Sequence, residues 1–144
     1  ICKLKSIFQS LDLINQECQV VLPLHPRAKY VLEKQDISTK ITLIDPVGYY
    51  AMLELLKNCK MVLSDSGGLQ KEAFFNKKHC IIAREETEWT ELVTNGFAEI
   101  VGSDAKKIVA AFENFQHSNH DFSMELYGND VGEKIYKSIK NLIQ

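Results

Sequence analysis

The segment MVLSDSGGLQKEAFF, Met61–Phe75, decides the fold of this chain. Its first residues are apolar and β-forming, the sequence DSGG interrupts them, and a helix-forming run that contains Glu72 follows. This order predicts a strand over 60–65, a tight turn, and a helix over 68–76. Two adjacent glycines at such a turn let a ligand approach the backbone without meeting a Cβ atom.

Short apolar runs alternate with helical patterns on both sides of this segment. Further strands are predicted over 18–24, 40–45, 79–84 and 98–102, and further helices over 1–15, 27–35, 49–59, 87–96, 103–116 and 131–143. Gly96 is expected to end one helix, and Ser103 or Asp104 to cap the next. The alternation predicts an α/β fold, with a Rossmann-like parallel sheet covered by helices on both faces. The length of 144 residues fits a single domain over 1–144.

The composition excludes several classes of protein. The chain is 45% hydrophobic and 25% charged with a net charge of −2, which favours neither nucleic acid nor an anionic membrane as a partner. No run approaches the roughly 18 apolar residues of a membrane span. Cys2, Cys18, Cys59 and Cys80 are widely spaced, as expected of apolar fillers in a reduced, cytoplasmic protein. Because the sequence starts inside a helical pattern without a Met, we expect a piece of a longer protein.

The C-terminal ends of parallel strands share one edge of a sheet, and ligands bind there. Four loops are therefore candidates: residues 25–27, 45–50, 64–68 and 84–89.

The glycine loop has the residues of a nucleotide site. Gly67 and Gly68 would expose backbone N–H groups to a diphosphate at a helix N-terminus, and Ser66 could add a hydroxyl donor. Glu72, one turn further, could accept hydrogen bonds from the vicinal hydroxyls of a ribose. The alternative is a tight turn with Ser66 or Asp65 as helix cap and Glu72 in solvent. These residues alone leave both open, because the pattern matches neither GxGxxG nor the P-loop.

The loop before the helix over 49–59 could recognise a base. Pro46 and Gly48 kink it, so its backbone could meet the edge of a base, and Met52 could lie against the ring. The alternative is an ordinary loop followed by a core methionine.

Two more loops carry charged residues. Arg84 could pair with a phosphate or with one of the three glutamates in the next four residues. Trp89 is unexpected in such an acidic run, and it could cover a ligand or an interface; the alternative is a solvated charged face. His25 could contact a phosphate or a sugar hydroxyl, or could cap a helix. The sequence shows neither metal-ligand spacing nor a nucleophile–base motif, so we predict no metal and no cofactor.

Taken together, several segments resemble the C-terminal half of the non-hydrolysing UDP-N-acetylglucosamine 2-epimerases. The resemblance covers about residues 18–140. It is carried by LPLHPR (22–27), LIDPVGYYAMLELL (43–56), VLSDSGGLQKEAFF (62–75), REETEWTELVTNG (84–96) and IVGSD (100–104).

The resemblance implies one half of a glycosyltransferase-B-like architecture, with the active site between two Rossmann-like domains. The family interconverts UDP-GlcNAc and UDP-ManNAc for surface polysaccharides. The C2 proton leaves, UDP is expelled to give 2-acetamidoglucal, and UDP then adds back while C2 is protonated on the other face. The catalytic carboxylates of the family lie in the N-terminal domain, which this chain lacks. The resemblance therefore implies that this chain is a cytoplasmic, UDP-binding C-terminal domain that is inactive alone. The full-length protein would be a homodimer.

The resemblance also implies roles for particular residues. The diphosphate would be bound by Ser66, Gly67 and Gly68, and the ribose by Glu72. The uracil would meet the Val47 backbone and Met52, and Arg84 and Glu88 would shape the phosphate end of the pocket. His25 matches a position that contacts an activating UDP-GlcNAc in some members. The chain departs from the family at LYGNDVGEKI (126–135), where Asp130 replaces the second glycine of a Tyr-Gly-Asp-Gly stretch. The final helix of this architecture often crosses to the other domain.

Two other functions stay open on the sequence. A glycosyltransferase of the same architecture also binds its nucleotide in the C-terminal half, and it would require an acceptor for turnover. A ligand-free, flavodoxin-like interaction domain would need no nucleotide at all.

Overall fold

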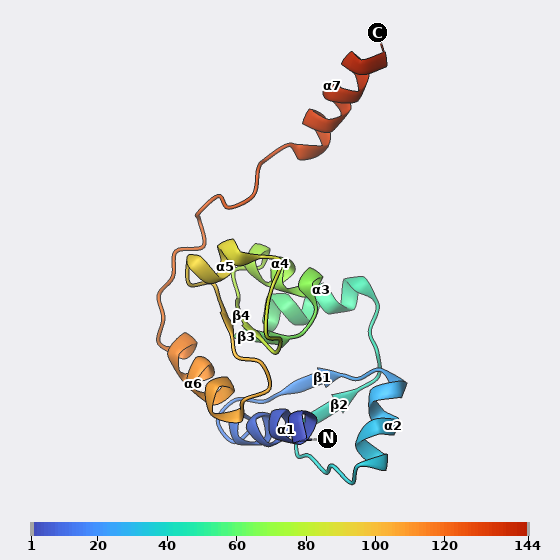
Figure 1. Ribbon diagram of the computed structural model, residues 1–144, viewed down its shortest axis with the longest axis vertical. Coiled ribbons are helices and arrows are strands. Elements are labelled where there is room, and N and C mark those ends of the chain that lie inside the picture. Colours follow the sequence, from blue (N-terminus) through green and yellow to red (C-terminus); the bar gives the residue numbers. More distant parts are fainter. Residues whose placement is uncertain (1, 144) are drawn as a thin grey trace.

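The order of elements is that of an α/β protein. The computed structural model describes residues 2–143, with the side chains of residues 3–143. The elements are α1 (Cys2–Ile14), β1 (Val21–Pro23), α2 (Pro26–Lys34), β2 (Thr42–Ile44), α3 (Tyr49–Asn58), β3 (Met61–Ser64), α4 (Gly67–Phe75), β4 (His79–Ile82), α5 (Thr90–Thr94), β5 (Ala98–Ile100), α6 (Ala105–Gln116) and α7 (Val131–Ile143) (Figure 1). The predicted α/β class and every predicted element are confirmed.

All strand pairs are parallel, as predicted, but the strands form two separate sheets instead of the single predicted sheet. One sheet pairs β1 with β2, and the other has the order β3-β4-β5. β1 is only three residues long and ends in Pro23, which has no N–H to donate to a ladder. The sequence pattern indicated the parallel direction but not this division.

Helices cover both faces of the three-stranded sheet because side chains alternate along its central strand. In β4, Cys80 and Ile82 belong to a core cluster that includes Leu56 of α3 and Ala73 of α4. Ile81 points to the other face and packs in a cluster with residues of α6. These three side chains of β4 are 1% exposed or less, which is typical of a parallel strand buried on both faces.

Strand β1 and helix α5 each begin three residues later than predicted, because side chains bind the neighbouring backbone. Asn15 Oδ1 accepts the Val20 N–H at 2.8 Å, so the predicted strand over 18–24 begins only at Val21. Thr87 Oγ1 accepts the Trp89 N–H at 3.1 Å, so α5 begins at Thr90 rather than at 87.

The predicted helix ends are confirmed. Asp104 is the N-cap of α6, and its carboxylate accepts the N–H groups of Lys106 and Lys107. Gly96 follows α5 with φ +77°, and the bonds Gly96 N–H to Val93 O and Phe97 N–H to Leu92 O close a Schellman motif.

Helix α7 extends away from the rest of the molecule (Figure 1). All its described residues are exposed, including Val131, Ile135 and Ile139, although these recur every four residues as on an apolar helix face. Before this helix, Asp130 has φ +55°, so it keeps the left-handed conformation that glycine favours, at a cost of about 1 kcal/mol. None of the helices in residues 2–143 has the length and apolar character of a membrane span.

The cysteines that the structure describes behave as apolar fillers. Cys18, Cys59 and Cys80 are free thiols, and burial raises the pKa of Cys59 and raises that of Cys80 to about 12. The side chain of Cys2 lies outside the described part.

Two histidines that are far apart in the sequence meet at the opposite end of the sheet from the glycine loop. His79, at the start of β4, is 7% exposed, and its Nε2 lies 2.9 Å from His120 Nδ1 and 3.2 Å from Ser118 Oγ. Its ring stacks on Phe115 with centroids 4.4 Å apart. Burial, and then the nearby His120, lower the pKa of His79 from 6.5 to about 4.

Lowering the pH from 7 to 5 is therefore expected to destabilise the chain through His79. Below pH 6.5 His79 is protonated in the unfolded chain, but in the folded chain it stays neutral down to about pH 4. The free energy of unfolding therefore decreases as the pH is lowered through this window. At pH 5 the loss is about 2 kcal/mol. Urea denaturation at both pH values measures it, with His79→Phe, which keeps a ring against Phe115, as the matched variant. An equal loss in both proteins would show that His79 is not the cause.

Candidate functional site

The N-terminus of α4 is open. Ser66 occupies its N-cap position, but its side chain makes no capping hydrogen bond. Instead, Ser64 Oγ accepts the Ser66 N–H at 3.0 Å, and the first helical bond runs from Gln70 N–H to Ser66 O. Within residues 2–143, the N–H groups of Gly67 and Gly68 have no protein partner. They are therefore available to an anion at the positive end of the helix.

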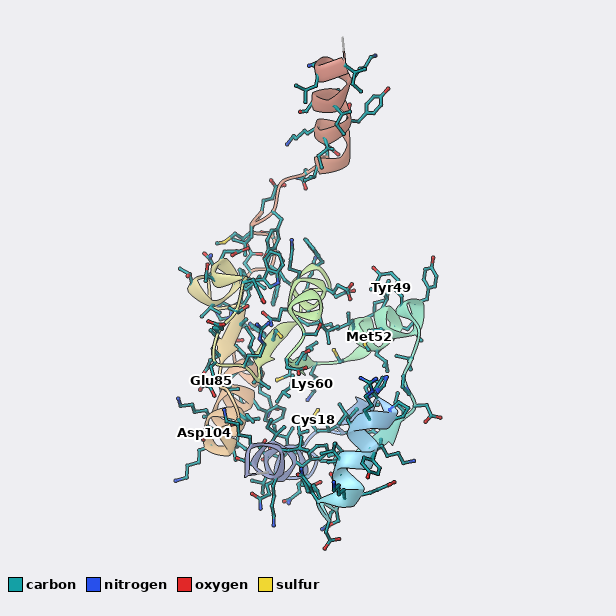
Figure 2. The ribbon with its side chains drawn as sticks, turned by 45° about the vertical axis from the view of Figure 1, so that its right-hand side comes forward. Cys18, Tyr49, Met52, Lys60, Glu85 and Asp104 are labelled. Atoms are coloured by element: carbon teal, nitrogen blue, oxygen red, sulfur yellow. The ribbon has the colours of Figure 1, made fainter. Side chains whose placement is uncertain are left out.

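Two other helices that follow strands, α2 and α6, have side chains bound to the N–H groups at their N-termini. His25 Nδ1 accepts the Arg27 N–H at 3.3 Å at the start of α2. Asp104 caps α6, and Ser6 Oγ accepts the Ala105 N–H at 3.2 Å. A hollow of about 670 Å³ adjoins this end of α6 and includes Glu85, and Figure 2 shows Glu85 and Asp104 on the same side of the molecule. Because the N–H groups at the start of α6 are already hydrogen-bonded, the hollow is not an anion site like the one offered by the N–H groups at the start of α4.

Helix α3 shares the open arrangement of α4. Its N-cap is Gly48, which makes no side-chain capping bond and has open space where a Cβ would lie. Val47 precedes it and is half-buried, and Met52, also half-buried, lies one turn into the helix (Figure 2). The predicted base-binding and diphosphate-binding loops thus precede two helices without side-chain caps.

Arg84 and Glu88 lie beside the glycine loop as a bidentate ion pair. Arg84 Nη1 and Nη2 donate to the two carboxylate oxygens of Glu88 at 3.1 and 3.0 Å. A Cβ added to Gly67 would lie 3.1 Å from Glu88 Oε2, so this carboxylate reaches the loop. The backbone N–H of Glu88 and the Arg84 guanidinium lower the pKa of Glu88. A carboxylate here would repel a diphosphate, and the paired guanidinium offsets that charge.

Glu72 is half-buried on α4. Its backbone carbonyl accepts the N–H and the side-chain amide of Asn76, but its carboxylate makes no hydrogen bond or ion pair within residues 2–143. Asp65 is exposed and does not cap the helix. Of the two residues in the alternative interpretation, Ser66 does occupy the N-cap position but without a side-chain capping bond, and Asp65 does not cap the helix. The ribose contact of Glu72 remains a prediction.

The structure brings some predicted site residues together. Ser66, Gly67, Gly68, Arg84 and Glu88 surround the start of α4. His25 caps α2 and is exposed at the end of β1, and no described hydrogen bond or ion pair joins it to the glycine loop. Its proposed contact with an activating nucleotide stays untested.

Gln70 and Thr87, which hold the glycine loop, were not predicted as site residues, and Trp89 was singled out without its contact to this loop. Gln70 is fully buried, and its Oε1 accepts the Thr87 hydroxyl at 2.5 Å. Trp89 Nε1 donates to the carbonyl of Gly67 at 2.8 Å. A fully buried glutamine on the first turn of a helix implies a polar partner, which the sequence does not identify because Thr87 is 17 residues away.

A parallel α/β domain with open helix N-termini at the strand-end edge defines the class of Rossmann-like ligand-binding domains. The profile of the UDP-N-acetylglucosamine 2-epimerase family matches residues 2–140, and the chain belongs to this family. The resemblance found in the sequence is confirmed, and the match favours an epimerase over a glycosyltransferase or a ligand-free interaction domain.

Several members of this family are similar to the chain. It is 42% identical over 127 residues to UDP-2,3-diacetamido-2,3-dideoxy-D-glucuronate 2-epimerase of Pseudomonas aeruginosa, covering 88% of this chain and 36% of that protein. It is 37% identical over 135 residues to a UDP-N-acetylglucosamine 2-epimerase homolog of Methanococcus maripaludis, covering 90% and 38%. The chain thus spans less than two-fifths of these curated relatives.

Solved structures support the fold. The crystal structure of the Methanocaldococcus jannaschii UDP-GlcNAc 2-epimerase in complex with UDP-GlcNAc and UDP is similar with a TM-score of 0.84 and 31% identity. The similarity covers 96% of this chain and 41% of that one.

Proposed function

We propose that this chain is the UDP-binding, C-terminal part of a sugar-nucleotide 2-epimerase, and that the enzyme interconverts UDP-GlcNAc and UDP-ManNAc. The supporting observation is the uncapped, glycine-opened N-terminus of α4 in a chain that belongs to the epimerase family. The Gly67 and Gly68 amides would bind the diphosphate, Ser66 would donate its hydroxyl, and Glu72 would accept the ribose hydroxyls.

In the proposed reaction this chain holds the leaving group. The C2 proton is removed and the bond between C1 and the diphosphate oxygen breaks, giving 2-acetamidoglucal and UDP. UDP then adds back to C1 while C2 takes a proton on the opposite face. Donors at the start of α4 stabilise the negative charge that develops on the diphosphate as the bond breaks. The acid–base groups would come from the remaining part of the enzyme, so the chain alone should show no turnover.

UDP is expected to stabilise the chain in proportion to its binding. At ten times its Kd, UDP adds about 1.4 kcal/mol, which corresponds to a rise in Tm of about 4 °C. Differential scanning fluorimetry over a UDP series measures the shift, and ADP at equal concentration is the control, because it lacks the uracil edge that the Val47 backbone would meet. An unchanged Tm with UDP at saturating concentrations would contradict the proposed function.

A second substrate deserves the same test. The Pseudomonas aeruginosa relative, at 42% identity, is named for UDP-2,3-diacetamido-2,3-dideoxy-D-glucuronate. That compound shares UDP and a 2-acetamido group with UDP-GlcNAc, so the same elimination and re-addition would apply to it. It differs by an acetamido group at C3 and a carboxylate at C6. Initial rates with both compounds, in a protein that adds the rest of the family's length, would distinguish the two activities.

We further propose that α7 packs against the part of the enzyme that lies outside this chain. Val131, Ile135, Ile139 and Leu142 are each at least half exposed, and they form an apolar face on a helix that points away from the body (Figure 1). An amphipathic helix normally buries such a face. The N-terminal domain is the proposed partner; a cytoplasmic homodimer of the whole enzyme remains a prediction.

A further inference from the structure

Trp89 lies at the point where the candidate diphosphate site is held in shape. It is the only tryptophan of the chain, and its Nε1–H donates to the Gly67 carbonyl at 2.8 Å. Its own backbone N–H donates to Thr87 Oγ1, and the same hydroxyl donates to buried Gln70 of α4. The loop before α5 is thereby tied to the first turn of α4 at two places.

The hydrogen bond from Trp89 to the Gly67 carbonyl orients the whole Gly67–Gly68 peptide group. A peptide group is planar, so the Gly67 C=O and the Gly68 N–H lie in one plane and point in opposite directions. When Trp89 fixes the carbonyl, it also fixes the direction of the Gly68 N–H, which is one of the open donors. This restraint matters because adjacent glycines have more backbone freedom than any other pair.

The indole of Trp89 is held in place by Lys71 and Tyr127. Lys71 Nζ lies 4.2 Å from the centroid of the Trp89 ring and 4.1 Å from that of Tyr127. The two rings meet nearly at right angles with centroids 6.2 Å apart, so the ammonium is enclosed between aromatic faces. Lys71 is on α4, one turn after Gly67, so the helix that receives the hydrogen bond also secures the side chain that donates it.

We propose that Trp89 is a positioning residue for the diphosphate-binding end of α4: its indole N–H orients the Gly67–Gly68 peptide, and Lys71 and Tyr127 keep the indole in place. The inference rests on the proposed function, which supplies the diphosphate. It assigns Trp89 no contact with the nucleotide, although the sequence suggested that it could cover a ligand.

Trp89→Phe tests the proposal because it keeps an aromatic ring and removes the N–H donor. Isothermal titration calorimetry with UDP should show Kd about fivefold higher than in the unchanged chain, the effect of one lost hydrogen bond. Phe115→Leu is the control for stability: Phe115 stacks on His79, at the opposite end of β4 from the glycine loop. This control should lower Tm and leave the UDP Kd unchanged.

Fluorescence gives a second readout. Excitation at 295 nm reports only Trp89, so UDP should change the emission of the unchanged chain as the Gly68 amide binds the diphosphate. Tyr127→Leu removes one wall of the Lys71 enclosure and keeps the fluorophore; it should raise the UDP Kd and shift the emission to longer wavelength. If Trp89→Phe does not fold, Tyr127→Leu still tests the proposal.

The outcomes separate the two proposals. If the unchanged chain does not bind UDP, the proposed function fails. If it binds UDP, and Trp89→Phe and Tyr127→Leu bind it equally well, only the positioning role of Trp89 fails. A lower Tm with an unchanged Kd would likewise show that Trp89 has a purely structural role.

Discussion

Gly68→Ala is expected to make the chain more stable and at the same time to abolish most of its affinity for UDP. A Cβ at this position meets only Ser66 Oγ, at 3.9 Å, which is an ordinary contact. Gly68 lies inside the first turn of α4 and is not among the residues with positive φ. Alanine is a better helix former than glycine by up to about 1 kcal/mol, so Tm should rise by about 3 °C.

The loss of UDP follows from the same methyl group. If the diphosphate binds the Gly67 and Gly68 amides, it must approach the backbone closely, and the space beside Gly68 is open for it. A methyl group there would hold the phosphate oxygens away from hydrogen-bonding distance. We expect Kd to rise by at least tenfold, which is about 1.4 kcal/mol.

Gly132→Ala is the matched control for this change. Gly132 is also in the first turn of a helix, α7, and has nothing within 4 Å of its added Cβ. Helix α7 lies far from α4 (Figure 1). It should leave UDP binding unchanged. Gly67→Ala would be less informative because its Cβ meets the Glu88 carboxylate at 3.1 Å. If the Gly68→Ala chain is more stable and binds UDP normally, Gly68 serves only the turn and the proposed diphosphate contact is contradicted.

The sequence predicted those features that depend on neighbouring residues. The apolar run of β4 and the glycines before α4 indicate their elements because side-chain period and backbone freedom act within a few residues. Asp104 was one of two candidate caps, and it caps α6 as such residues do. Each of these signals can be read within a single turn or strand.

The contacts that shape the candidate site could not be predicted in the same way. Trp89 reaches Gly67 across 22 residues, and His79 reaches His120 across 41. Both pairs depend on how the elements pack, and no local pattern records that packing. The acidic run at 85–88 indicated a charged loop, but only the structure shows that Glu88 faces Gly67 while paired with Arg84.

Glu72→Gln is expected to weaken UDP binding by about 10- to 100-fold without changing Tm. Hydrogen bonds to a charged group contribute about 1.5–3 kcal/mol each, and the amide is a weaker and less complete acceptor for two vicinal hydroxyls than the carboxylate. Stability should change by less than about 0.5 kcal/mol, because the Glu72 carboxylate makes no hydrogen bond or ion pair within residues 2–143.

The direction of the change decides between the two interpretations of Glu72. If the carboxylate is merely solvated near the diphosphate, its removal relieves repulsion and UDP binds more tightly. If it holds the ribose, its removal weakens binding despite that relief. The 2′,3′-dideoxy analogue of UDP sharpens the test, because a ribose contact predicts equal affinity for that analogue in both proteins, or a higher one in Glu72→Gln. Glu113→Gln, an exposed site on α6, is the control and should bind UDP as the unchanged chain does.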